Sequence, residues 1–363
     1  MGWLNGNRIR ILLVGIVVAI VFGGGGRAKA EITMSEWTNV GPVVNTVADQ
    51  RHCDLSHDGL ELYFSGWRPD TYYGKSDIYV ARRKTINDPW EKPVNLGPIV
   101  NSSGSEVEPS ISGDGVELYF ACYDDWNLRV CTRPSKDAPW SNKAKIGPPV
   151  GSDGPAMEVG SNDAYGPDIS ADGLSLYFCS TRVGGYGQSD IWMTKRAAKN
   201  DPWDAPVNLG PNVNTGADDW DPSISTDGLT LVFTRGYRSM WASTRKSVDE
   251  DWGPAVYLGF PTTANFLGPA LSPDGSTLYF AAHGDWGGYG NWDLWQLTFA
   301  PAVDFNGDGI VDLDDLLILV EHWGEQEALC DIGPLPLGDG VVDIEDLKVF
   351  IAEWEKKNLL AQP

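Results

Sequence analysis

The sequence is poor in positive charge. It holds 27 Lys and Arg residues against 50 Asp and Glu residues, which gives a formal net charge of −23 at pH 7. Nucleic acids and anionic membrane surfaces are negatively charged and attract basic proteins. The charge balance therefore argues against both as partners. It is compatible with metal ions, neutral glycans and basic proteins.

Histidine and cysteine are also scarce. Only four His residues occur, and His52 and His57 are the sole pair close in sequence, which argues against a zinc site. The five Cys residues are an odd number; Cys122 and Cys131 flank one expected hairpin and could pair, but no disulfide is predicted. The sequence has no nucleophile elbow, phosphate-binding glycine loop or dinucleotide fingerprint, so these common enzyme motifs are excluded.

The chain has a single long hydrophobic run, residues 11–22. Arg8 and Arg10 precede this run, and the small-residue pattern Ala28-Lys29-Ala30 follows it. A spanning helix needs about 20 apolar residues, so the run is short for a membrane anchor, which remains the alternative. We expect residues 1–30 to be a signal peptide. The expected location is secreted, extracellular or at the cell surface, with no membrane span after cleavage.

Glycine and proline, in contrast, are plentiful and evenly scattered, with 42 and 24 residues. Asp-Gly turns recur at intervals of 47 to 58 residues, each preceded by a short strand pattern and followed by a second one. The Asp residues of these turns are Asp58, Asp114, Asp172, Asp227 and Asp274. Glycine after aspartate permits the positive φ of a tight hairpin. The spacing is typical of propeller blades, and residues 165–210 show one complete unit of four short strands.

The last unit lacks its fourth strand, which in the other units follows a tryptophan. The missing pattern, a Trp followed by an apolar-Gly ending, occurs at the other end of the chain, in residues 37–46. An N-terminal strand that completes the last blade would close a ring and remove its open edges. The sequence therefore predicts an all-β, five-bladed propeller over residues 35–299.

The turn motif also carries a family resemblance. Pro-x-x-Ser-x-Asp-Gly followed by Leu-Tyr-Phe, as in the segments that begin at Pro109 and Pro167, resembles the WD40-like repeat of the TolB type. Blade one departs from the motif, because Cys53 stands where the others carry proline. The resemblance covers residues 35–299. It implies an exported binding or interaction module more often than an enzyme.

The leading residues of the innermost strands are expected to ring one mouth of the central channel. The candidate ligand-binding residues are His52, Glu106, Glu108, Tyr165, Asp219, Trp220, Asp221 and Phe266, with Arg51 beside them. Aromatic faces next to carboxylates suit a sugar ring, so we predict a glycan or cation site. The alternative is that these are ordinary solvated strand entries.

Two other functions remain open at this stage. Glu108 and Asp221 are weak catalytic candidates for a glycoside hydrolase, which needs paired carboxylates about 5 to 9 Å apart. A propeller that binds only proteins, with no small ligand, is the third hypothesis. The glycine-rich loops at 184–187 and 287–290 offer a further exposed surface for carbohydrate or protein, unless they pack on adjacent blades.

The tail changes to helical periodicity with oxygen-bearing side chains at alternate loop positions. In the first loop the expected Ca²⁺ ligands are Asp304, Asn306, Asp308, Ile310 through its carbonyl, Asp312 and Asp315. In the second loop they are Asp331, Asp339, Val341 through its carbonyl, Asp343 and Asp346. Alternate oxygens curl around one hard cation, so two Ca²⁺ sites are predicted, the second weaker.

Two such loop-and-helix copies, within residues 302–357, resemble a type I dockerin domain. The resemblance implies a small all-α domain that docks, with Ca²⁺ bound, onto a cohesin-like partner or a cell-surface scaffold protein. Fifteen acidic residues face three Lys in residues 301–363, so we expect the tail to unfold without Ca²⁺.

Overall fold

The computed structural model describes residues 32–34, 37–68, 73–151, 163–261, 263–284, 287–301, 303–306, 310–326, 330–333, 335 and 338–360. The expected signal peptide and Asp308 lie outside these ranges. No helix among the described residues is long and apolar enough to cross a membrane. All five cysteines are buried and none is joined to another by a disulfide, so the possible pairing of Cys122 with Cys131 is not formed.

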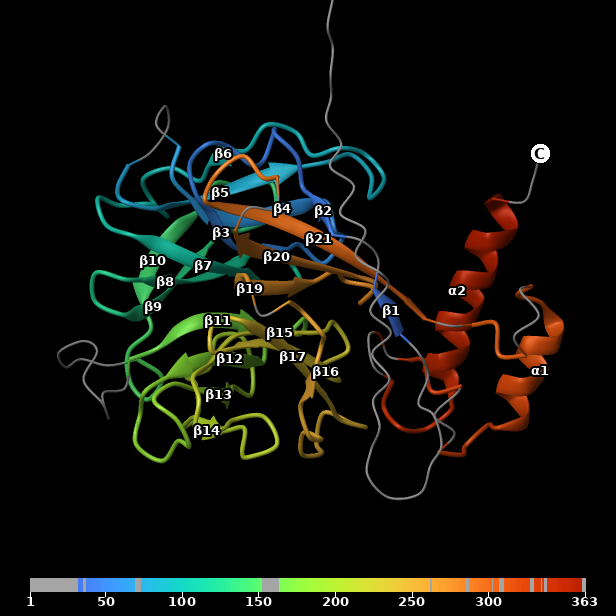
Figure 1. The fold of residues 1–363 in the computed structure, drawn as a ribbon. Coiled ribbons are helices and arrows are strands. Elements are labelled where there is room, and N and C mark those ends of the chain that lie inside the picture. The colour runs from blue at the N-terminus through green and yellow to red at the C-terminus, as the bar shows by residue number, and fades with distance from the viewer. Residues whose placement is uncertain are drawn as a thin grey trace, which may run out of the picture.

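The described strands form five antiparallel sheets arranged around a central axis (Figure 1), which confirms the five-bladed propeller. Blade one contains β3 (Gln50–Leu55), β4 (Glu61–Gly66), β5 (Asp77–Arg82) and β6 (Val94–Asn95). Blade two contains β7 (Glu106–Ile111), β8 (Glu117–Cys122), β9 (Asn127–Thr132) and β10 (Ser141–Lys145). Blade three contains β11 (Tyr165–Ile169), β12 (Ser175–Ser180), β13 (Asp190–Lys195) and β14 (Val207–Asn208).

The remaining two blades bring both ends of the propeller together. Blade four contains β15 (Asp219–Ile224), β16 (Thr230–Arg235), β17 (Ser239–Thr244) and β18 (Val256–Tyr257). Blade five contains β19 (Asn265–Leu271), β20 (Thr277–His283), β21 (Trp292–Pro301), β2 (Thr38–Asn39) and β1 (Ile32–Met34). The first strand of each blade lies nearest the axis, because these strands contact one another from blade to blade.

The recurring Ser-x-Asp-Gly motif forms the hairpin between the first two strands of each blade. In blade one the Ser56 hydroxyl donates to Asp58 Oδ1 at 2.6 Å, and the Glu61 amide donates to Ser56 Oγ at 2.9 Å. Gly59 adopts φ +67°, where a side chain would be strained. The same pair of contacts recurs in the other four blades.

The N-terminal segment closes the ring as predicted. Thr38 pairs with Gln296, and the buried Asn45 side chain both donates to and accepts from the Leu294 backbone at 2.8 Å. Blade five extends beyond the predicted propeller range of residues 35–299, because Ile32 of β1 pairs with Pro301 of β21. Strands from the two ends of the propeller thus share one blade. This pairing closes the ring and leaves no unpaired strand edge where the two ends meet.

Adjacent blades are joined through a repeated arginine. Arg133 of blade two lies 4.2 Å from the ring centroid of Trp140 and donates to the Tyr63 hydroxyl of blade one at 3.3 Å. Arg245 makes the same two contacts with Trp252, at 4.4 Å, and with Tyr177 of blade three, at 3.1 Å. The tryptophan that marks the fourth strand in the sequence is therefore part of an inter-blade contact.

The tail contributes two helices, α1 (Leu313–Glu321) and α2 (Ile344–Leu360). Each follows one of the acidic loops. Buried apolar side chains from both helices and both loops form a separate small core, which includes Phe305, Leu319 and Phe350.

Candidate functional site

The innermost strands share a bulge that turns one residue of each blade out of the regular strand alternation. At this position φ is positive in all five blades, with values of 37°, 56°, 55°, 49° and 52° for His52, Glu108, Gly166, Asp221 and Gly268. The pairing register shifts at each site. Positive φ is uncommon for residues other than glycine and clusters at functional sites.

The two glycines leave room for the three side chains. A Cβ on Gly268 would lie 2.5 Å from the Cα of His52, and one on Gly166 would lie 3.1 Å from Cys179 Sγ. Both glycine amides also bind the carboxylates of the preceding blade. Gly166 N donates to Glu108 Oε2 at 2.6 Å, and Gly268 N donates to Asp221 Oδ2 at 2.9 Å.

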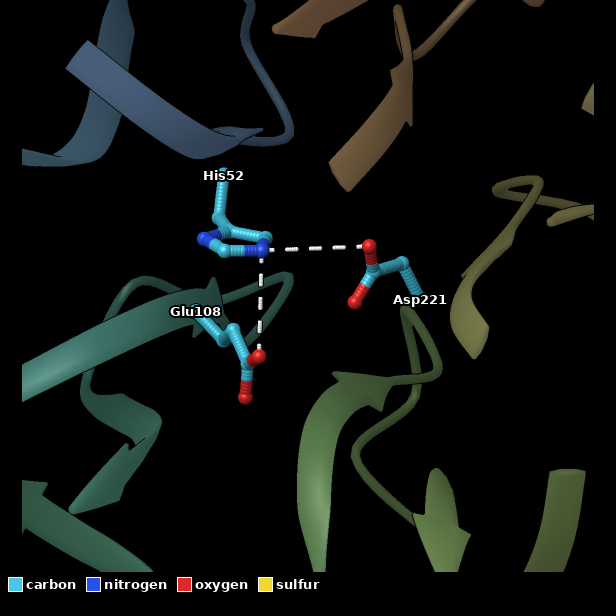
Figure 2. Close-up of side chains that lie close together, drawn as sticks. All are labelled: His52, Glu108 and Asp221. Carbon is cyan, nitrogen blue, oxygen red and sulfur yellow. Dashed lines mark ion pairs between the residues drawn. The ribbon is translucent and has the colours of Figure 1, made fainter. Parts of the chain in front are cut away.

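His52, Glu108 and Asp221 converge near the axis (Figure 2), and we refer to them as the axial triad. His52 Nε2 lies 3.8 Å from Glu108 Oε1 and 3.8 Å from Asp221 Oδ2. All three side chains are buried, with 5 to 8% of their surface exposed. The hydroxyl of Tyr123 also donates to Glu108 Oε1. Three chemically active groups from three blades therefore meet at one point.

Burial sets the protonation of the axial triad. Burial, and then the nearby Asp221 carboxylate, raise the pKa of Glu108 to about 8, against the opposing hydrogen bonds from Tyr123 and Gly166. Burial lowers the pKa of His52, against the opposing charge of Asp221. At neutral pH Glu108 therefore holds a proton and His52 is neutral. The axial triad thus contains a carboxylic acid that can donate a hydrogen bond and an uncharged imidazole.

A pocket of about 420 Å³ opens above the axial triad. This volume lies within the roughly 300–1,000 Å³ range of small-molecule sites. Of the expected mouth residues, it is lined by Arg51, His52, Glu108, Tyr165, Trp220 and Asp221. The structure therefore brings these six predicted residues together around one pocket.

Aromatic rings form much of the pocket wall. Trp220 meets Tyr237 edge to face, with ring centroids 3.9 Å apart, and Tyr123 stacks on Trp126 at 4.3 Å. Tyr165 contacts Trp126 edge to face at 5.8 Å. Such packing holds the rings in fixed orientations. Tyr237 is 48% exposed, so part of its ring stays open to a ligand.

Three expected mouth residues do not line this pocket. Glu106 and Asp219 are fully buried, where they accept hydrogen bonds from the Ser102 and Thr215 amides at 2.9 and 2.8 Å. Phe266 lies in the apolar core of blade five. The reason is the bulge, because it redirects only one residue of each strand toward the axis. The residues two positions before the bulge residue, which are Glu106, Asp219 and Phe266, instead anchor the preceding loop or pack in the core.

The sequence reasoning missed the pocket residues that come from the loops after the second strands. These include Trp67, Lys75, Tyr123, Trp126 and Tyr237. The available signal was an aromatic residue within a few positions of the second strand's end in blades one, two and four.

The glycine-rich loops pack against neighbouring blades. Asp190 accepts from the Gly187 amide at 2.9 Å, and a Cβ on Gly187 would lie 2.3 Å from the carbonyl oxygen of Ala217. Gly290 has the same relation to Asp293 and the Ala48 carbonyl. The glycines are thus required for blade packing, although the Tyr186 and Tyr289 rings remain about half exposed.

A second ring of polar side chains lies two residues further along the inner strands. Each side chain accepts a hydrogen bond from a backbone amide of the next blade. The pairs are Asp54 with Ile111 at 2.7 Å, Ser110 with Ile169 at 3.0 Å, Asp168 with Ile224 at 2.6 Å and Ser223 with Leu271 at 3.2 Å. This belt joins blades one to five in sequence beneath the axial triad.

The belt predicts a pH-dependent stability. Burial, and then Asp54, raise the pKa of Asp168 well above its ordinary value. Because the folded state then binds a proton more tightly than the unfolded state, the stabilisation present at low pH is lost as pH rises above about 4. Asp168→Asn keeps an acceptor for the Ile224 amide and removes this loss. We expect it to raise Tm by an amount that grows between pH 4 and pH 8.

The measurement is thermal unfolding of both proteins across that pH range, with the exposed Asp201→Asn as the control variant. A pKa that is higher by one in the folded than in the unfolded state changes the free energy of unfolding by up to about 1.4 kcal/mol. A Tm difference that stays constant with pH would show that the Asp168 carboxyl is not the titrating group.

The two tail loops share one pattern of hydrogen bonds. Asp315 accepts from the Phe305, Asn306 and Asp312 amides at 2.7, 3.2 and 3.0 Å. Asp346 accepts from the Ile332, Gly333 and Asp343 amides at 2.6, 2.8 and 2.7 Å. This correspondence puts Asp331 in the place of Asp304, the first position of the loop.

The other expected loop ligands surround these contacts. The Asp331 carboxylate accepts from the Asp339 and Gly340 amides at 2.9 Å each. Asp312 and Asp343 begin α1 and α2 and accept from the Asp314 and Glu345 amides. Ile310 is 61% exposed. Asp308 lies outside the described residues.

No protein-family model matches the sequence, and the comparison with curated proteins finds no relative. Among solved structures, the chain is similar to a family 117 glycoside hydrolase from Zobellia galactanivorans, with 14% identity, a TM-score of 0.49 and coverage of 73% of this chain and 90% of that one. An α-L-arabinofuranosidase from Podospora anserina has 13% identity, a TM-score of 0.48 and coverage of 73% and 96%.

TolB from Acinetobacter baumannii is a further structural neighbour, with 12% identity and a TM-score of 0.43. The match covers 71% of this chain and 56% of TolB, so the chain spans little more than half of that protein's length. At these values the neighbours transfer no activity. The fold of this chain rests on its own strand pairings.

Proposed function

We propose that the propeller is a carbohydrate-binding module whose ligand enters the pocket above the axial triad. The observation that carries the proposal is the combination of aromatic walls from several blades with a polar floor. A sugar ring stacks its axial hydrogens on an aromatic face while its hydroxyls bind carboxylates and nitrogen groups. The pocket supplies both kinds of contact on adjoining surfaces.

The closed floor also favours one mode of binding. The axial triad lies at the floor of the pocket, and its carboxylates are held by amides of the neighbouring blades. A chain end can reach such a floor, whereas the middle of a polysaccharide cannot. We therefore propose that the module recognises a terminal sugar unit.

Trp220 tests this function. Trp220→Ala removes one aromatic wall, and we expect it to weaken binding of a neutral oligosaccharide at least about tenfold, or by about 1.4 kcal/mol. The measurement is a glycan array with the full chain, followed by calorimetric titration of each ligand that binds. Tyr289→Ala, on an exposed ring that does not line the pocket, is the matched control. Equal affinity of Trp220→Ala and wild type for every ligand would contradict the proposal.

One observation favours a second candidate, a glycoside hydrolase. Glu108 and Asp221 offer donor atoms within 4.8 Å of each other, and burial keeps Glu108 protonated at neutral pH. A retaining enzyme places its acid and its nucleophile about 5 to 5.5 Å apart. Reducing-sugar release from a bound glycan, abolished in Glu108→Gln, would support this candidate. Binding without release supports the module alone.

For the rest of the chain we propose export and tethering. The basic and apolar start of the sequence supports secretion through a signal peptide, to the extracellular space or cell surface. The matching hydrogen bonds of the two tail loops support two Ca²⁺ sites and a dockerin-like domain. Its partner would be a cohesin-like or cell-surface scaffold protein. Exposed apolar side chains on the two helices, such as Leu317 and Ile351, offer the contact surface.

A further inference from the structure

We propose that the axial triad binds one divalent transition-metal cation, for which Zn²⁺ is the probe. His52 would supply one nitrogen, and Glu108 and Asp221 one oxygen each. This site is distinct from the Ca²⁺ loops of the tail. It goes beyond carbohydrate binding, because it concerns the floor of the pocket and needs no glycan.

The spacing of the donor atoms suits a cation. One donor atom from each residue lies within 4.8 Å of the other two, and His52 Nε2 is 3.8 Å from both carboxylates. A separation of 3.8 Å is too long for a hydrogen bond. Because two of these separations are 3.8 Å and the third is at most 4.8 Å, a cation equidistant from the three atoms would lie about 1.9 to 2.5 Å from each. That range includes the zinc distances of about 2.0 to 2.2 Å.

His52 provides an independent indication. It is 7% exposed, its Nδ1 has no hydrogen-bond partner, and no hydrogen bond is made by Nε2 within the part of the chain that the structure describes. Figure 2 shows Nε2 directed toward the space between the two carboxylates. Leaving a buried polar group without a partner costs about 1–3 kcal/mol. Coordination would give Nε2 a partner at a distance shorter than the 3.8 Å that separates it from each carboxylate, while Nδ1 would keep none.

The charges and the donor types point to the same ligand. Within the described residues neither Glu108 nor Asp221 forms an ion pair with a lysine or arginine; His52 is their shared partner. On binding, a divalent cation would displace the Glu108 proton to solvent and balance the two carboxylates. Ca²⁺ prefers six to eight oxygen ligands, whereas imidazole nitrogen suits transition metals.

The pocket leaves one side of the cation open. Three protein ligands with a free fourth position are typical of reactive metal sites, whereas structural sites are closed by four. The remaining coordination position would face the aromatic walls and hold water or a ligand oxygen.

The test is a calorimetric titration of the untagged full chain with ZnCl₂, in saturating Ca²⁺ so that the tail loops are filled. We expect one equivalent of Zn²⁺ to bind. Asp221→Asn keeps an acceptor for the Gly268 amide, and Asn tolerates positive φ, so the fold should remain. We expect this variant to bind Zn²⁺ at least about 100-fold more weakly.

Asp49→Asn is the control, because Asp49 lies in the same pocket but outside the axial triad. Its Zn²⁺ affinity should equal that of the wild type, and thermal unfolding should show that all three proteins are folded. Absence of Zn²⁺ binding by the wild type, or unchanged binding by Asp221→Asn, would overturn the proposal. Glycan binding is measured on chelator-treated protein in a separate experiment, so the two proposals can fail independently.

Discussion

Trp37→Ala is expected to destabilise the propeller by about 3 kcal/mol or more, the low end of the range of about 3–5 kcal/mol for loss of a packed aromatic side chain. Trp37 lies in the N-terminal segment that closes the ring. Its indole is 5.2, 5.4 and 5.3 Å from the ring centroids of Phe260, Phe266 and Phe280. Trp37 is partly buried, and removing it uncovers these three rings where the two ends of the propeller meet.

Thermal and urea unfolding of the full chain measure the effect. For a domain of this size each kcal/mol lowers Tm by roughly 2–4 °C. Trp37→Phe should recover much of the stability, since it restores aromatic packing. Trp67→Ala, at a ring 42% exposed in the pocket wall, should change Tm little. If both tryptophan-to-alanine variants lose the same stability, the closing segment has no special role in holding the ring.

If the tail loops bind Ca²⁺ as we propose, its removal is expected to unfold the tail while the propeller stays folded. Asp315 and Asp346 are fully buried, and the tail contains 15 acidic residues against three Lys. Without a cation, the loop carboxylates repel one another and the small core around Leu319 and Phe350 has too little apolar area to compensate. Helical circular dichroism should fall on chelation and return when Ca²⁺ is added back.

The full chain is measured at 222 nm before and after chelation, and proteolysis then locates the unfolded part. We expect cleavage within 303–360 only in the chelated protein. Asp304→Asn removes one proposed Ca²⁺ ligand, so a higher Ca²⁺ concentration should be needed to restore the signal. The surface variant Asp88→Asn should behave as wild type. An unchanged helical signal after complete chelation would sink the prediction.

The sequence predicted the blades well because their signals are local. A serine two residues before an aspartate, with glycine next, determines one hairpin, and the Leu-Tyr-Phe run that follows determines the buried second strand. Ring closure was also predictable, because the Trp37 segment repeats the pattern that the last blade lacks. These inferences needed only periodicity and turn chemistry.

The site was predicted only in part, because it depends on a bulge that a single sequence does not reveal. Glu106 and Glu108 are two residues apart, so regular alternation would put both on one face. The structure instead turns Glu108 to the axis and leaves Glu106 bound to Ser102. A weak signal existed, since proline follows Glu108 and Asp221 directly. Counting histidines alone likewise hid the mixed set around His52, which assembles from three blades.

The ring closure also constrains the order in which the chain can fold during synthesis. Thr38 contacts Gln296, 258 residues later. The first propeller strand to be made therefore has no partner until nearly the whole propeller has been synthesised. Until then the edge of blade five and the Trp37 side chain stay uncovered, and both are sites for association with other chains. A chaperone that holds the emerging chain open would protect this segment longest.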